Sequence, residues 1–195
     1  MRTPLFFPFR YNVAIDFVAF ILTRHGGQKR IDEIAVLAYL CDRVAIARLN
    51  KPIIGGHYVT TLDGPMISEL YDILDSGILR LRVPHGTLEP PFTKQENSVK
   101  LIRQPDRDIF TAPELTVVTD VDASFGHMAK HELENWCAQN YPEFGGQTIT
   151  EIATITLPWL AAILGKTNRE IVQIMRMAAE GSALEGLLDE SQLIP

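Results

Sequence analysis

The stretch RIDEIAVLAYLCDRVAIARL, residues 30–49, decides the fold of this chain. Its apolar residues recur at steps of three and four, which is the spacing of one face of an α-helix. The sequence Asn50-Lys51-Pro52 follows directly and is typical of a helix end. The stretch therefore predicts a helix of about 20 residues whose apolar face is turned toward the core.

Helical patterns also occur on both sides of this stretch. The run before it, residues 13–24, predicts a largely buried helix that ends at Gly26-Gly27, because glycine tolerates the left-handed conformation that caps a helix. A Thr followed by Glu three residues later is a capping box, and this pattern occurs at Thr148 and at Thr167. Further helices are predicted at residues 115–125 and 129–139, and from Thr167 to Gly181, with Leu184, Leu187 and Leu188 in a last short turn.

The middle of the chain predicts a different structure. Residues 57–62 are β-branched and aromatic, as in a strand or a buried extended segment. In Asp63-Gly64-Pro65 we expect Pro65 to open a short helix that ends at Gly77. Residues 78–113 are rich in proline and predict a small antiparallel sheet with strands at 78–83 and 98–103 and a mobile connection around 84–97. The fold class predicted is α+β, predominantly α-helical, in a single compact domain over residues 1–195.

Composition and charge narrow the classes of function. Hydrophobic residues make up 46% of the 195 and charged residues 22%, as in a soluble globular domain. The net charge of −6 disfavours a general nucleic-acid-binding protein. The charge is uneven, since residues 1–65 carry eight basic and five acidic groups whereas residues 111–195 carry four and twelve. The acidic part is either a docking surface for a basic partner or a solvated face.

The chemical motifs of common enzymes do not occur in the sequence. Cys41 and Cys137 are far apart and lie among apolar residues, which predicts a reduced, cytoplasmic protein, and we expect no membrane insertion. His127 and His131 have the spacing of two metal ligands on one helix, but Gly126 predicts a break there. We therefore expect no catalytic residues, no metal and no cofactor. A metal-dependent or acid/base enzyme that uses His127 and His131 stays open as the less favoured alternative.

Four groups of residues together resemble one family. They occur in this order: residues 34–43 with Asp42-Arg43, residues 57–72 with Gly64-Pro65, residues 125–133 with Phe125-Gly126, and residues 164–171 with Leu164-Gly165. This order is similar to that of the Panacea domain of SocA-like antitoxins, over roughly residues 13–180. One departure is that Cys137-Ala138 and Pro142-Glu143-Phe144 stand where the family usually shows Thr-His and Pro-Glu-Trp.

The resemblance implies a mainly helical fold and an antitoxin of a prokaryotic or phage toxin–antitoxin system. Such a protein neutralises a co-encoded protein toxin by direct binding. The alternative within the family is an adaptor that delivers the toxin to a protease. Neither the identity of the toxin nor the oligomeric state follows from the resemblance. We expect Tyr58, Thr61, Asp63 and Met66, around the Gly-Pro segment, to contact the partner.

Overall fold

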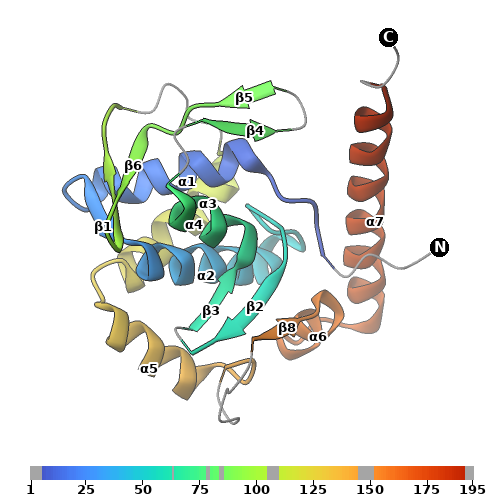
Figure 1. Ribbon diagram of the computed structural model, residues 1–195. Helices are drawn as coiled ribbons and strands as arrows, with labels where there is room; N and C mark the ends of the chain where they lie inside the picture. The colour runs from blue at the N-terminus through green and yellow to red at the C-terminus, as the bar shows by residue number, and fades with distance from the viewer. Residues whose placement is uncertain are drawn as a thin grey trace.

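The computed structural model describes residues 6–62, 64–77, 80–83, 86–104, 110–144 and 152–191. Helix α2 (Ile31–Leu49) lies at the centre of the molecule, with α1 (Tyr11–Arg24), α4 (Ala112–Phe125) and α5 (Lys130–Asn140) around it (Figure 1). Residues on every side of α2 are buried, which is typical of a helix enclosed by its neighbours. The predicted central helix is therefore confirmed. Its buried residues extend beyond the apolar face that the sequence spacing predicts.

The ends of the first two helices follow the sequence signals. Gly26 and Gly27 have φ angles of +73° and +84° directly after α1, and the Gly27 N–H donates to the carbonyl oxygen of Leu22 at 2.7 Å. Asn50 caps α2 in the left-handed conformation with φ +59°. These residues satisfy carbonyl groups that a helix end otherwise leaves without partners.

The Gly-Pro segment forms a hairpin and does not begin a helix. Strand β2 (Tyr58–Thr61) pairs antiparallel with β3 (Gly64–Ile67), and helix α3 (Ser68–Ser76) begins only after Ile67. The prediction that Pro65 opens a helix is therefore wrong. Pro65 lies in a strand at the edge of its sheet, where the N–H that proline lacks is not needed for pairing. The predicted helix end at Gly77 is confirmed, with φ +65°.

The proline-rich middle of the chain contains more strands than predicted. Strands β4 (Leu81–Val83) and β7 (Ser98–Leu101) lie within the two predicted segments. The stretch 84–97, expected to be a mobile connection, contains β5 (Gly86–Leu88) and β6 (Phe92–Gln95), so the expectation of a connection without strands is wrong for the described part, and its mobility stays a prediction. β5 pairs with β4, whereas β6 pairs with β7, which also pairs with β1 (Gln28–Arg30). The strand β1 comes from a distant part of the sequence, so its pairing has no local signal.

The C-terminal part returns to the β2–β3 hairpin before it becomes helical. Strand β8 (Ala153–Ile155) pairs antiparallel with β2, giving a sheet of order β3-β2-β8. Helices α6 (Leu157–Ile163) and α7 (Asn168–Ser191) follow. The predicted capping box at Thr167 is confirmed, because the Glu170 carboxylate accepts hydrogen bonds from the Thr167 N–H and hydroxyl at 2.8 and 2.7 Å. The other predicted box, Thr148 with Glu151, lies outside the described residues.

Helix α7 continues through Gly181, so the predicted helix end at this glycine is wrong. In Figure 1, α7 stands at one side of the molecule, next to α6 and to the segment that precedes α1. The observed fold class is the predicted one, α+β and mainly helical, with one hydrophobic cluster that extends from Phe9 to Ala178. In the described part of the chain, no helix combines the length and the hydropathy needed to cross a membrane.

Candidate functional site

A buried carboxylate on α2 holds the loop that leads into the hairpin. Asp42 is fully buried, and its oxygens accept hydrogen bonds from the N–H groups of Ile53, Ile54 and Gly55 at 2.7–2.8 Å. The Tyr58 hydroxyl donates a fourth hydrogen bond at 3.0 Å. Burial raises the pKa of Asp42 to about 6, although these hydrogen bonds act to lower it. The carboxylate thus fixes residues 53–58 onto α2.

A second polar cluster lies next to it on the same helix. Glu143 Oε1 accepts hydrogen bonds from the Tyr39 hydroxyl at 2.8 Å and from Arg43 Nε at 2.5 Å. The Arg43 guanidinium lies 3.6 Å from the centre of the Tyr141 ring, a cation–π contact. The Tyr39 ring meets that of Tyr58 edge-on at 5.7 Å, so the two clusters are in contact.

These clusters contain the residues that carried the family resemblance, yet they offer no open site for a substrate. Asp42, Tyr39, Tyr58 and Glu143 are all at most 5% exposed. Burial, followed by the nearby carboxylates, raises the pKa of Tyr39 and of Tyr58 well above the usual value, so both hydroxyls remain donors. We therefore assign a structural role to this network: it holds the hairpin and the 141–144 turn onto α2.

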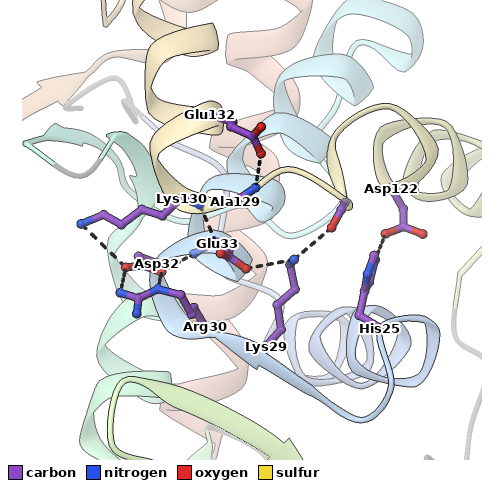
Figure 2. Close-up of polar contacts among 10 residues, drawn as sticks. His25, Lys29, Arg30, Asp32, Glu33, Asp122, Ala129, Lys130 and Glu132 are labelled. Atoms are coloured by element: carbon purple, nitrogen blue, oxygen red, sulfur yellow. Dashed lines mark hydrogen bonds and ion pairs between the residues drawn. The ribbon is translucent and has the colours of Figure 1, made fainter.

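Several acidic residues of the C-terminal part pair with basic residues of the N-terminal part. Figure 2 includes one such contact, in which His25 Nε2 lies 2.6 Å from Asp122 Oδ1. Burial alone would raise the pKa of Asp122, but the hydrogen bonds and positive charge of His25 and Arg24 outweigh it and lower the pKa. Four arginines of the N-terminal part form ion pairs with acidic residues of the C-terminal part: Arg10–Glu114, Arg24–Asp122, Arg43–Glu143 and Arg48–Asp120. These four acidic residues are therefore bound to arginines of this chain, and they do not form a free acidic docking surface.

A polar cleft of about 620 Å³ lies between the start of α2, the β6–β7 turn and the turn after α4. Inside it, Lys29 Nζ donates to the Gly126 carbonyl oxygen at 2.9 Å and lies 3.0 Å from Glu33 Oε2, and the Lys130 N–H donates to Glu33 at 3.2 Å (Figure 2). Gly126 is required for this arrangement, because a Cβ atom there would lie 2.3 Å from the Asp122 carboxylate. The charged groups at the base of the cleft thus pair with one another and lock the α4–α5 turn onto α2.

The two histidines predicted as a possible half-site for a metal do not share a helix. His127 lies in the turn after α4, and His131 lies in the first turn of α5; both are exposed. In the ranges that the structure describes, no group of three or more His, Cys, Asp or Glu residues has an arrangement that could hold a metal ion. Cys41 and Cys137 are buried and are not joined to each other.

The structure separates the four residues predicted to contact a partner. Tyr58 and Met66 are 1% and 5% exposed, so both lie in the base of the hairpin. Thr61 is partly exposed, and its hydroxyl donates to the Gly64 carbonyl oxygen at 3.1 Å. Asp63 lies outside the described residues. A role of these four residues in partner binding stays a prediction.

Two exposed apolar side chains lie at the tip of the same hairpin. Leu62, directly after β2, is 76% exposed, and Ile152, directly before β8, is 73% exposed. The β2–β8 register pairs Thr60 with Ala153, and its continuation by one residue places Ile152 opposite Thr61. We call Thr61, Leu62 and Ile152 the hairpin-tip surface. Nothing in the sequence distinguishes Leu62 and Ile152, because one exposed Leu or Ile carries no signal by itself.

Comparison with known proteins gave one family. A family model described as "Antitoxin SocA-like, Panacea domain" matches residues 37–142, which extend from α2 through the hairpin and the small sheet to the end of α5. No curated protein and no solved structure matches the chain. The predicted resemblance is confirmed over residues 37–142. The segments on either side, which the prediction also included, lie outside the match.

Proposed function

The chain belongs to the SocA-like antitoxin family with a Panacea domain, and from this premise we propose that it neutralises a co-encoded protein toxin by binding it directly. The family supports an antitoxin role. The proposal adds the mode of action, which is that the chain occupies a surface of the toxin and carries out no reaction on it. A complex of ordinary size, about 1,600 Å² of buried surface, is sufficient for this.

The hairpin-tip surface is the observation that carries the proposal. Leu62 and Ile152 are large apolar side chains that are more than 70% exposed, and the β2–β8 pairing places them near the same end of the sheet. Most of the free energy of a protein complex comes from a few such side chains when they are fully buried by the partner. We propose that Leu62 and Ile152 are these anchors, and that Thr61 and Asp63 contact the toxin beside them.

The buried residues below the tip have a supporting role in this proposal. Tyr58 donates to the fixed Asp42 carboxylate, and Met66 is paired with Val59 across the hairpin. A binding surface that is rigid before the partner arrives loses less conformational entropy on binding. Tyr58 and Met66 thus contribute to affinity by holding the tip, without touching the toxin.

The proposal can be tested by growth rescue with a matched pair of variants. The product of the neighbouring gene is expressed with the wild-type chain, with Ile152→Asp, or with Ile102→Asp, which changes another exposed isoleucine (59% exposed) at the end of β7. We expect the wild type and Ile102→Asp to restore growth and Ile152→Asp to fail, with all three proteins folded by circular dichroism. Full rescue by Ile152→Asp would overturn the assignment of the tip.

The same experiment tests the mode of action. Direct binding leaves the half-life of the toxin unchanged or longer while growth is restored. A half-life that becomes shorter only when this chain is present would contradict neutralisation by binding and would identify a protease adaptor.

A further inference from the structure

The segment before α1 is extended and lies between the body of the molecule and α7 (Figure 1). Its backbone pairs with the loop that Asp42 fixes: the Gly56 N–H donates to the Phe7 carbonyl oxygen at 2.9 Å, and the Arg10 N–H donates to the Ile54 carbonyl oxygen at 2.9 Å. Two backbone hydrogen bonds thus join residues 6–10 to residues 54–56. We call residues 6–10 the strap.

The strap packs directly against two glycines of the loop before β2, Gly55 and Gly56. Gly55 has φ +77°, and a Cβ atom there would lie 2.3 Å from the Pro8 carbonyl oxygen. A Cβ atom on Gly56 would lie 3.0 Å from the Phe9 ring. The approach of the strap to this loop is therefore so close that no residue larger than glycine fits without moving it.

The other side of the strap contacts α7. A Cβ atom on Gly181 would lie 3.1 Å from Pro8 Cδ, so Pro8 is held between Gly181 on α7 and Gly55 on the body. On the same helix Ile174 and Ala178 are completely buried, two turns and one turn before Gly181, respectively. The face of α7 that is buried at Ile174 and Ala178 thus contacts the strap at Gly181.

The first residues of the strap make one more contact with the loop. The Phe6 ring lies 3.7 Å from the His57 ring, centre to centre. His57 is held in turn by Glu69 of α3, with Nδ1 2.5 Å from Oε1 and its backbone N–H 2.9 Å from Oε2. The strap is therefore attached at three points, to the loop, to His57 and to α7.

From these contacts we infer that the strap holds α7 against the rest of the molecule. We further infer that the strap and α7 detach and reattach together. If Pro8 is displaced, Gly181 of α7 loses the residue against which it packs. If α7 is displaced, Pro8 loses its contact on that side. Because the two ends of the chain leave together, any molecule that binds either released end shifts the same equilibrium.

A pair of glycine variants in the full chain tests this coupling from the body side. Gly55→Ala places a methyl group where Pro8 packs. Gly26→Ala is the control, because it forces alanine into nearly the same left-handed conformation (φ +73°) but with open space around it. Hydrogen exchange is measured by mass spectrometry over the strap, α7 and α2. We expect Gly55→Ala to raise exchange in the strap and in α7 by about tenfold or more, corresponding to about 1.4 kcal/mol of opening free energy, and to leave α2 protected.

A second pair tests the coupling from the helix side, and it remains informative if Gly55→Ala does not fold. Gly181→Leu presses on Pro8, whereas Ala183→Leu adds the same side chain at an exposed position two residues away. We expect faster exchange of the Gly56 N–H in Gly181→Leu, and no change in Ala183→Leu. The inference is overturned if Gly55→Ala leaves exchange in α7 at the level of Gly26→Ala, or if Gly181→Leu leaves the Gly56 N–H as protected as in the wild type.

Discussion

The two ends of strand β2 differ in exposure and in their hydrogen bonds. Tyr58 begins the strand, is 1% exposed and donates a hydrogen bond to Asp42, whereas Leu62 follows the strand and is 76% exposed. At the base of the hairpin, Tyr58 belongs to the hydrogen-bond network around Asp42 on α2, whose residues carry the family resemblance. The tip contains the exposed side chains of Leu62 and Ile152, which lie outside that network.

This difference separates the residues that preserve the fold from those that we propose to bind. The family resemblance rests on residues such as Tyr39, Asp42 and Arg43, and the structure places these in the interior or against Glu143. Changes at the base should therefore lower the free energy of unfolding. Changes at the tip should lower affinity for the toxin and leave the stability of the fold nearly unchanged.

The largest effect is expected at the base. Asp42→Ala removes the acceptor of three backbone N–H groups and of the Tyr58 hydroxyl, and we expect a loss of about 3–5 kcal/mol in the free energy of unfolding. Urea denaturation measures this loss. Asp72→Ala, at an exposed position of α3, is the control and should change stability by less than about 0.5 kcal/mol. A loss below about 1 kcal/mol for Asp42→Ala would show that the network does not hold the hairpin.

The next largest effect is expected at the tip. Leu62→Asp places a charge at a proposed anchor, and we expect affinity for the purified product of the neighbouring gene to fall by about tenfold to a hundredfold. Leu184→Asp, a substitution at an exposed position of α7 (59% exposed), is the matched control. Titration calorimetry measures both affinities, and the urea midpoint shows that the fold is intact. Equal affinity for the two variants would remove the distinction between base and tip.

A smaller effect depends on pH. The pKa of Asp122 is lowered in the folded chain because the hydrogen bonds and charges of Arg24 and His25 outweigh its burial. The folded state thus favours the charged carboxylate, and this contribution to stability is present above the ordinary value of 3.8 and is lost as the pH falls below it. We expect Asp122→Asn to reduce the loss of stability on acidification below about pH 4, as measured by urea denaturation at a series of pH values. If Asp122→Asn and the wild type lost the same amount of stability below about pH 4, this assignment would be contradicted.

The smallest effect is expected on the exposed face of α7. Arg176 pairs with Glu180 at 2.9 Å, with both side chains more than 60% exposed. Such a pair four residues apart contributes only about 0.3–0.5 kcal/mol, so Arg176→Ala should barely move the thermal midpoint. A loss above about 1 kcal/mol would show that this face of α7 is covered in solution.

The sequence predicted the helices well because their apolar spacing extends over several turns. The central helix and the caps at Gly26-Gly27 and Thr167 are examples. Strands β1, β5, β6 and β8 have only three or four residues, too few for local periodicity to reveal them. β1 and β8 also pair with segments that are distant in the sequence. At Pro65 two local rules compete, a helix start and an edge strand, and pairing with β2 decides between them.

The candidate site could be predicted only in part. The resemblance led to the hairpin, but it favoured Tyr58 and Met66, which the structure buries. Leu62 and Ile152 lie near the same end of the sheet only because β8 pairs with β2, and these residues are 90 positions apart in the sequence. The pairing of basic residues near the N-terminus with acidic residues of the C-terminal part was not predicted for the same reason, since net charge along the sequence does not show which groups meet.

The central claim is that this chain acts by occupying its partner and converts nothing. Its most direct test is an activity titration, in which a fixed amount of the purified product of the neighbouring gene receives increasing amounts of this chain. We predict a linear loss of toxin activity that is complete near equimolar amounts, with an intact complex and unmodified toxin by mass spectrometry. Complete loss of toxin activity at a small fraction of the equimolar amount would contradict the account, because it would show that each chain inactivates many toxin molecules in turn.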